Sequence, residues 1–193
     1  MTAPRVSVLM PVYNAAETLV QTLESIAGQS FEDFEVVAVD DGSEDGSGEI
    51  LQGWVEKDCR FRVLLEEHRG IVETPNRGLE ECRGEFVARM DADDKMHPQR
   101  LDKQVGMLDA DEGLSVVSCL VETFPREDLG QGMIIYEEWL NSLVEGEDIL
   151  RDFFIESPIA NPSAMMRRRE LVELDDYQDR GWPEDYDLWL RYR

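Results

Sequence analysis

Three carboxylates stand within four residues, at Asp91, Asp93 and Asp94, directly after the apolar run 85–90. Like charges this close repel each other, so we expect a positive charge beside them, brought by a substrate. Asp91 and Asp93 form a D-x-D pair, and carboxylate oxygens are the ligands that Mg²⁺ and Mn²⁺ prefer. Because Mg²⁺ shares its shell with substrate phosphates, the pair indicates a phosphate-bearing substrate. An Asp-rich turn is the alternative, and we expect Asp94 to cap a helix that begins near Pro98.

A second acidic pair, Asp40 and Asp41, lies in "VDDGS" at the end of another apolar run. One interpretation is an Asx turn followed by a helix cap. The other is a binding role, since a carboxylate offers only acceptors and suits the N–H groups of a base or the hydroxyls of a ribose.

A third group, Glu184, Asp185 and Asp187, lies where "PEDYDLWLRYR" predicts the start of a helix. Acidic residues in a first turn interact favourably with the helix dipole, so their presence there can be explained without a catalytic role. A carboxylate beside a bound sugar would also serve as a general base that takes a proton from an incoming hydroxyl.

The elements that would position these groups alternate along the first two thirds of the chain. Short apolar runs bounded by turn residues predict strands at 6–10, 35–39, 61–66, 85–90 and 114–121. Between them, apolar residues at helical spacing predict helices, and Pro75 predicts a break, a kink or a new start in the third. Such alternation predicts a mainly parallel sheet covered on both faces, with ligands at the carboxyl ends of its strands. The second half is less regular, with helices predicted at 136–156 and from 183 onward.

Composition excludes several classes of partner. The chain has 193 residues, 42% of them hydrophobic, and a net charge of −24 from 43 acidic and 19 basic residues. This charge disfavours nucleic acid and anionic lipid, and one hypothesis for it is a salt-adapted source. Three scattered cysteines argue against a disulfide framework and a Cys-based zinc site. We see neither a secretory signal nor the run of about 18 apolar residues that spans a bilayer, so we expect a cytoplasmic protein.

The ordered set of motifs "PVYN", "VDDGS", "NRGL", "DADD" and "EDYDLW" resembles the family 2 glycosyltransferases of GT-A fold. The resemblance runs from about residue 5 to the chain end and is strongest through residue 110. It implies a single GT-A domain over 1–193: a Rossmann-like, mainly parallel sheet flanked by helices, and a smaller irregular half. Residues 5–110 would bind the nucleotide sugar, and residues 111–193 would form the acceptor side.

The resemblance also implies an activity, namely inverting transfer of a hexose-type sugar from a nucleotide-diphospho-sugar, most often a UDP-sugar. The acceptor would be a hydroxyl of a glycan or lipid-linked molecule in cell-surface polysaccharide synthesis, in the cytoplasm or at the inner face of the membrane. The cofactor would be Mn²⁺ or Mg²⁺, held by Asp91 and Asp93, and the catalytic base would be Asp185. The positions carried over to the nucleotide-sugar site are Pro11, Val12, Tyr13, Glu17, Asp40, Asp41, Arg69, Asn76, Asp91 and Ala92.

Two departures from the family pattern concern the acceptor side. Relatives often have a His in the stretch that here reads "NPSAMMRR", where this chain has Asn161 and Ser163. The chain also stops inside a predicted helix, so we expect it to be truncated relative to its family. A nucleotidyltransferase is an alternative, although no Gly-rich phosphate loop supports it. A nucleotide-sugar-binding or partner-binding module without turnover is the other.

Overall fold

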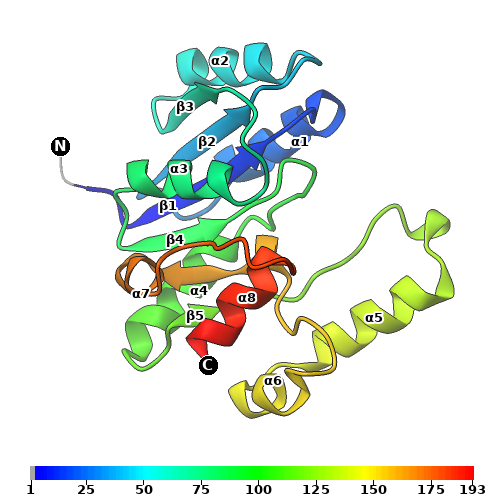
Figure 1. Cartoon of the computed structure of the whole chain (residues 1–193). Helices are drawn as coiled ribbons and strands as arrows, with labels where there is room; N and C mark the ends of the chain where they lie inside the picture. The colour runs from blue at the N-terminus through cyan, green and yellow to red at the C-terminus, as the bar shows by residue number, and fades with distance from the viewer. Residues whose placement is uncertain (1–2) are drawn as a thin grey trace.

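The computed structural model describes residues 3–193 and contains a six-stranded sheet with the order β3-β2-β1-β4-β6-β5 (Figure 1). Its strands are β1 (Val6–Val12), β2 (Phe34–Asp41), β3 (Phe61–Glu66), β4 (Phe86–Arg89), β5 (Val116–Val117) and β6 (Met165–Arg167). Strand β1 runs parallel to β2 and β4, and β2 runs parallel to β3. Strand β6 is antiparallel to both of its neighbours. The predicted mainly parallel sheet is confirmed.

Helices cover both faces of this sheet, as right-handed crossovers between parallel strands require. The helices are α1 (Ala16–Ala27), α2 (Ser47–Lys57), α3 (Glu73–Glu81), α4 (Arg100–Ala110), α5 (Gln131–Ser142), α6 (Gly146–Asp152), α7 (Arg168–Glu173) and α8 (Glu184–Tyr192). One core contains buried side chains of α1, α2 and α4, and the other contains those of α3, α7 and α8. The acidic end of the chain therefore packs against the same sheet as the N-terminal half.

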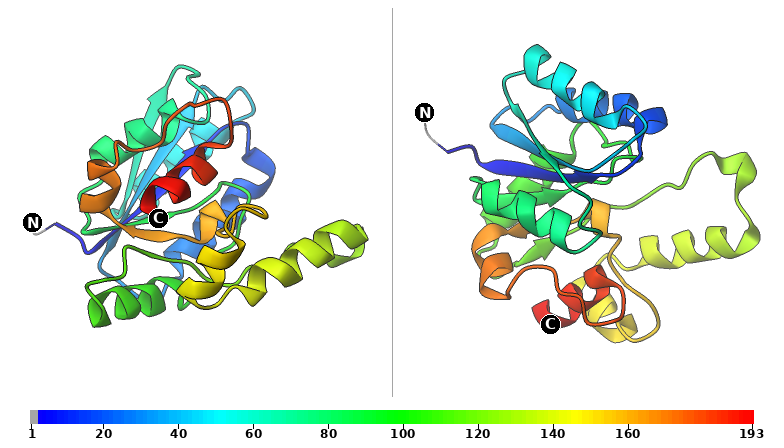
Figure 2. Two further views of the ribbon diagram at one scale, coloured as in Figure 1. Left: turned by 60° about the horizontal axis from the view of Figure 1, so that its bottom comes forward. Right: turned by 45° about the horizontal axis from the view of Figure 1, so that its top comes forward.

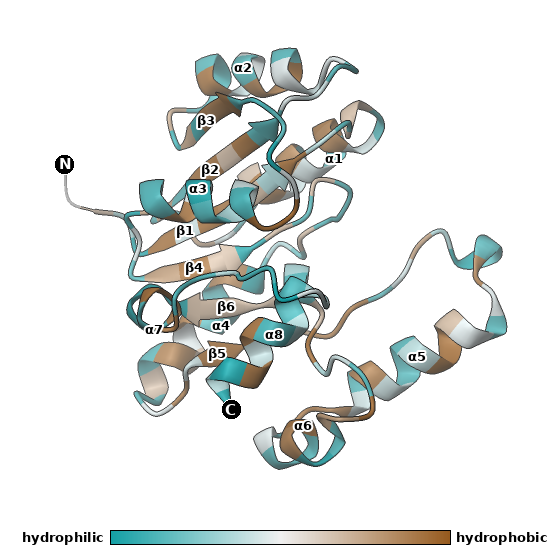
Figure 3. Ribbon diagram, in the orientation of Figure 1, coloured by the Kyte–Doolittle hydropathy of each residue, from teal (hydrophilic) through white to brown (hydrophobic). Residues whose placement is uncertain are grey.

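The central strands are apolar because they are buried on both sides, as Figure 3 shows by their brown colour. Along β1, Val8 and Met10 contribute to the first core while Leu9, between them, contributes to the second. All three side chains are fully buried. This explains why the strands appear in the sequence as continuous apolar runs.

The far edge of the sheet differs from the prediction. Instead of a strand over 114–121, only Val116 and Val117 form β5. A strand that the sequence analysis did not predict, β6, lies between β4 and β5. Its three residues belong to the stretch that was predicted to be irregular. Both residues of β5 pair with β6, whose three residues all pair with β4 on the other side.

Two helix starts also test the sequence analysis. Helix α3 begins at Glu73, so Pro75 lies in its first turn, where a missing N–H breaks no helical bond. This confirms a new start there. Helix α4 begins at Arg100 after Gln99, with no side-chain cap. The prediction that Asp94 caps this helix is therefore wrong, because residues 95–99 separate Asp94 from the start of the helix.

Residues 118–160 form an arm that projects from the sheet and carries α5 and α6 (Figure 2). The helix predicted over 136–156 is thus two helices, interrupted between Ser142 and Gly146. No helix within residues 3–193 is long and apolar enough to cross a membrane.

Candidate active site

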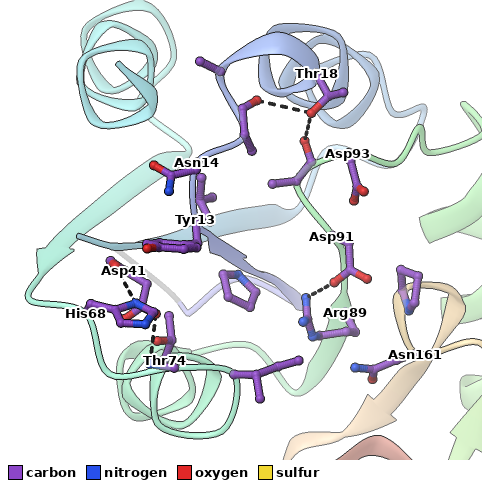
Figure 4. A pocket seen from close by; sticks show the side chains of 18 of the residues that line it. Tyr13, Asn14, Thr18, Asp41, His68, Thr74, Arg89, Asp91, Asp93 and Asn161 are labelled. Carbon is purple, nitrogen blue, oxygen red and sulfur yellow. Dashed lines mark hydrogen bonds and ion pairs between the residues drawn. The ribbon is translucent and has the colours of Figure 1, made fainter. Parts of the chain in front are cut away.

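A cavity of about 1370 Å³ opens at the carboxyl ends of β1, β2 and β4. This is the edge of a parallel α/β sheet at which ligands bind. Segments far apart in the sequence meet around it, from the β1–α1 turn to Asn161 (Figure 4) and the start of α8. Among the residues proposed from sequence, those that line it are Pro11, Val12, Tyr13, Glu17, Asp41, Asp91, Ala92, Asp93 and Asp185.

Three of the proposed residues do not line this cavity. Asp40 is buried and accepts a hydrogen bond from the N–H of Ser43 at 3.3 Å. The Arg69 guanidinium pairs with Glu66 at 3.5 Å, and only its backbone reaches the site. The Asn76 amide bonds to the backbone O and N–H of Tyr177 at 2.8 and 3.0 Å. Asn76 therefore joins α3 to the segment before α8.

Asp41 fixes the loop after β3. Its two carboxylate oxygens accept hydrogen bonds from the N–H groups of Arg69 at 2.6 Å and Gly70 at 3.0 Å. His68 Nδ1 lies 2.9 Å from the same carboxylate. Burial raises the pKa of Asp41, but these hydrogen bonds outweigh burial and hold the pKa below its usual range.

His68 is a site residue that the sequence analysis missed. Its ring stacks on Tyr13, with centroids 4.5 Å apart, and both side chains line the cavity. The two rings form an aromatic wall beside Asp41 (Figure 4). The available signal was position, because His68 follows β3 at the same sheet edge as the three acidic motifs.

Arg89 was also missed, and it corrects the idea that positive charge arrives only with a substrate. This buried arginine of β4 lies 2.8 Å from Asp91 and lines the cavity. Its positive charge also lowers the pKa values of Asp94, Glu184 and Asp185. In the sequence Arg89 lies within an apolar run, and its neighbours in the chain give no sign of its contact with Asp91.

Asp185 and Glu184 begin α8 on the opposite wall of the cavity. Burial raises the pKa of both carboxyl groups, and the nearby charge of Asp91 raises them further. Asp185 Oδ1 also accepts the N–H of Tyr186 at 2.7 Å, which lowers its pKa in part. A carboxylate with a raised pKa in a cavity suits general base chemistry.

Asp91 and Asp93 fit a hard divalent cation by the chemistry of their donor atoms, which are carboxylate oxygens at one rim of the cavity. Within residues 3–193, no group of three or more His, Cys, Asp or Glu side chains converges as a metal site. A cation here would therefore take its remaining ligands from water and from substrate phosphate, as Mg²⁺ usually does.

Asn161 and Pro162, at the stretch where relatives often have His, complete the wall between Arg89 and Asp185. Ser163 is buried beside them and lines a neighbouring cavity instead. The acceptor-side departure noted in the sequence thus lies at the cavity itself.

A mainly parallel sheet flanked by helices, with this cavity at the carboxyl ends of its strands, is the architecture of the GT-A fold. The chain belongs to the family "Glycosyl transferase family 2", whose model matches residues 7–174. It is 30% identical over 189 residues to the amylovoran biosynthesis glycosyltransferase AmsE of Erwinia amylovora, covering 96% of this chain and 68% of AmsE.

Two solved structures share the fold. One is S. aureus TarS 1-349 in complex with UDP-GlcNAc, with a TM-score of 0.77 and 24% identity over 97% of this chain and 52% of TarS. The other is the mannosyltransferase PcManGT from Pyrobaculum calidifontis in complex with GDP-Man and Mn²⁺. Its TM-score is 0.73 at 24% identity, over 97% of this chain and 51% of PcManGT. The chain spans between 38% and 66% of the length of three other curated relatives.

Proposed function

We propose that this chain transfers a sugar, with inversion, from a UDP-sugar to a hydroxyl of a glycan or lipid-linked acceptor in cell-surface polysaccharide synthesis. The observation that carries the proposal is that the Asp91–Asp93 pair and Asp185 line the same cavity. The name of AmsE supports a polysaccharide product, and the UDP-GlcNAc complex of TarS supports the donor class.

The nucleoside would lie against Tyr13 and next to Asp41. A carboxylate has about four lone-pair positions. The N–H groups of Arg69 and Gly70 and the His68 ring approach that of Asp41, and the Thr74 side chain also lowers its pKa through a hydrogen bond. A uracil N–H would therefore share an oxygen of Asp41 with one of these groups. Because the pKa of Asp41 is held low, the acceptor stays ionised at neutral pH.

The donor diphosphate would lie at Asp91 and Asp93, which would hold Mn²⁺ or Mg²⁺; the Mn²⁺ in PcManGT supports this assignment. When bound, such an ion neutralises the diphosphate and stabilises the charge on the leaving nucleotide. Arg89 would orient Asp91 through their ion pair and would keep a buried positive charge next to the cavity.

Asp185 would deprotonate the acceptor hydroxyl, which then attacks the anomeric carbon from the face opposite the leaving group. Burial and the charge of Asp91 make Asp185 a stronger base than an exposed aspartate. Cavity walls from α8 and Asn161 would exclude water around this proton transfer.

The test is UDP release from a panel of UDP-sugars with Mn²⁺ and an acceptor extract, comparing the wild type with Asp93→Ala and Asp185→Ala. We expect both variants to lose turnover, and calorimetry to show that only Asp93→Ala loses the Mn²⁺-dependent part of UDP affinity. Asp102→Ala, an exposed carboxylate of α4, is the matched control. Wild-type turnover in Asp93→Ala would refute the metal assignment, and wild-type turnover in Asp185→Ala would refute the base.

A further inference from the structure

Helix α1 presents a row of polar side chains beside its apolar stripe. The row consists of Thr18, Thr22 and Ser25 in the helix and Gln29 just after it. Spacings of four, three and four residues place all of them on one side. Each bonds to the backbone of residues 92–101, the segment that joins the D-x-D pair to α4.

Two of these contacts are made to the carbonyl of Ala92, the residue between the two aspartates. The hydroxyl of Thr22, itself buried, donates to the carbonyl of Ala92 at 2.9 Å. The hydroxyl of Thr18 approaches the same oxygen at 3.1 Å (Figure 4). One carbonyl thus receives two hydroxyl groups from successive turns of α1, which fixes the plane of the peptide that separates Asp91 from Asp93.

Further along, Ser25 and Gln29 hold the rest of the segment. Ser25 Oγ accepts the N–H of Met96 at 2.9 Å. The Gln29 amide donates to His97 O at 2.8 Å and accepts from the N–H of Leu101 at 3.2 Å. Buried backbone groups need such partners, and an irregular segment cannot supply them through regular secondary structure.

This segment also carries mutual repulsion. Asp91, Asp93 and Asp94 place three like charges within four residues, and like charges this close repel each other. Without contacts to other parts of the protein, this repulsion would move the carboxylates of Asp91 and Asp93 apart, and carboxylates that are far apart cannot bind the same cation. The side chains of α1 supply that restraint through uncharged hydrogen bonds, which leaves the carboxylate oxygens available.

We infer that the polar row of α1 is the positioning element of the D-x-D pair, with Thr22 as its main residue. The inference deepens the proposed function, because it rests on the role of Asp91 and Asp93 in binding the donor diphosphate with a cation. Thr22 touches no reacting atom and acts through the Ala92 peptide.

The test compares Thr22→Val, which keeps the shape and removes the hydroxyl, with Thr22→Ser, which keeps the hydroxyl. For Thr22→Val we expect about a tenfold loss of UDP affinity in Mn²⁺ by calorimetry, the equivalent of one hydrogen bond. UDP affinity without Mn²⁺ should stay within about twofold of wild type, and Thr22→Ser should restore binding. Amide hydrogen exchange within 92–97 should accelerate about tenfold in Thr22→Val while the β1 and β2 amides keep their rates.

Ile26→Val is the matched control, since it lowers stability through the buried apolar stripe of the same helix and leaves the polar row intact. If Ile26→Val lowers the Mn²⁺-dependent affinity as much as Thr22→Val does, the effect is only structural and the inference fails. The inference also fails if Thr22→Val binds Mn²⁺ and UDP like the wild type. A wild type whose UDP affinity ignores Mn²⁺ would instead refute the proposed metal role, and with it the functional part of the inference.

Discussion

Replacing Arg89 by Met should destabilise the protein in a way that a divalent cation repairs. Arg89 is buried, lies 2.8 Å from Asp91 and lowers the pKa of Asp94, Glu184 and Asp185. Met fills similar space without charge, so the variant isolates the loss of the cation. The carboxylates around the cavity would then lose the buried charge that pairs with Asp91, and of the two arginines that lower the pKa of Asp94 only Arg100 would remain.

The structure sets the size of the effect. Removing one partner of a fully buried ion pair costs about 3–5 kcal/mol. Because the Asp91 side chain is 37% exposed, water screens part of its charge, and we expect about 2–3 kcal/mol. For a chain of this size that corresponds to roughly 5–10 °C in Tm.

The assay is thermal unfolding at pH 7.5 and pH 5.5, with and without Mn²⁺. Mn²⁺ should raise the Tm of Arg89→Met more than that of the wild type, because it replaces the missing charge. A carboxyl group with a raised pKa destabilises the fold when it is ionised, and this destabilisation is lost as the pH falls and the group takes up a proton. The difference in Tm between Arg89→Met and the wild type should therefore be smaller at pH 5.5. Asp94, with a pKa of about 6 already in the wild type, should contribute within this window.

Arg151→Met is the control, since its ion pairs with Asp148 and Asp152 are exposed and contribute little. An Arg89→Met protein that melts like the wild type, or that responds to Mn²⁺ no more than the wild type does, would refute this account of the cavity charge.

Other perturbations have equally specific outcomes. Asp185→Asn should lower kcat by about 10²–10⁴-fold at unchanged UDP affinity, as measured by turnover and calorimetry. Because the pKa of Asp185 lies above its ordinary value of 3.8, wild-type kcat should fall on acidification with a midpoint above that value, and a rate that is flat down to pH 4 would contradict the base assignment. Gly78→Ala places a Cβ 2.4 Å from Leu9 Cδ1 in the core and should cost about 1–3 kcal/mol in urea unfolding. Gly53→Ala, with open space around it, should instead gain about 0.5–1 kcal/mol. Because the net charge is −24, the Tm should rise between 0.1 and 1 M KCl, since the Debye length falls from about 10 Å to about 3 Å and screens the repulsion among the acidic side chains. An unchanged Tm would show that this repulsion does not limit stability.

The alternation of apolar runs and helical stretches was enough to predict the sheet, because β1, β2 and β4 are buried on both faces. The polar ends of β1, β2 and β4 were also predictable, since the carboxyl ends of parallel strands share one edge. What could not be predicted was β6, whose three residues become a strand only because β4 and β5 lie on either side of them.

Side-chain partners were hardest to predict. Arg89 looked like a polar interruption of a strand, and nothing in its neighbours showed that it would lie 2.8 Å from Asp91. His68 reached the site through the geometry of a loop that Asp41 fixes. The polar row of α1 was also not predictable, because its partners are backbone groups of residues 92–101, some 70 positions further along the chain.

The insertion of β6 between β4 and β5 has a consequence for the order in which the molecule assembles. Strands β3, β2, β1 and β4 are contiguous in space and complete by residue 89, so their pairing needs no later segment. Strand β5 must wait for residues 165–167, some 50 positions further along the chain, before it finds its neighbour. Ala164, just before β6, accepts Arg100 Nη2 and the N–H of Arg89, so the same docking event fixes the floor of the cavity. The part of the cavity built on β1, β2 and β4 can thus form early, while the part lined by Asn161, Glu184 and Asp185 is added only with the last part of the chain.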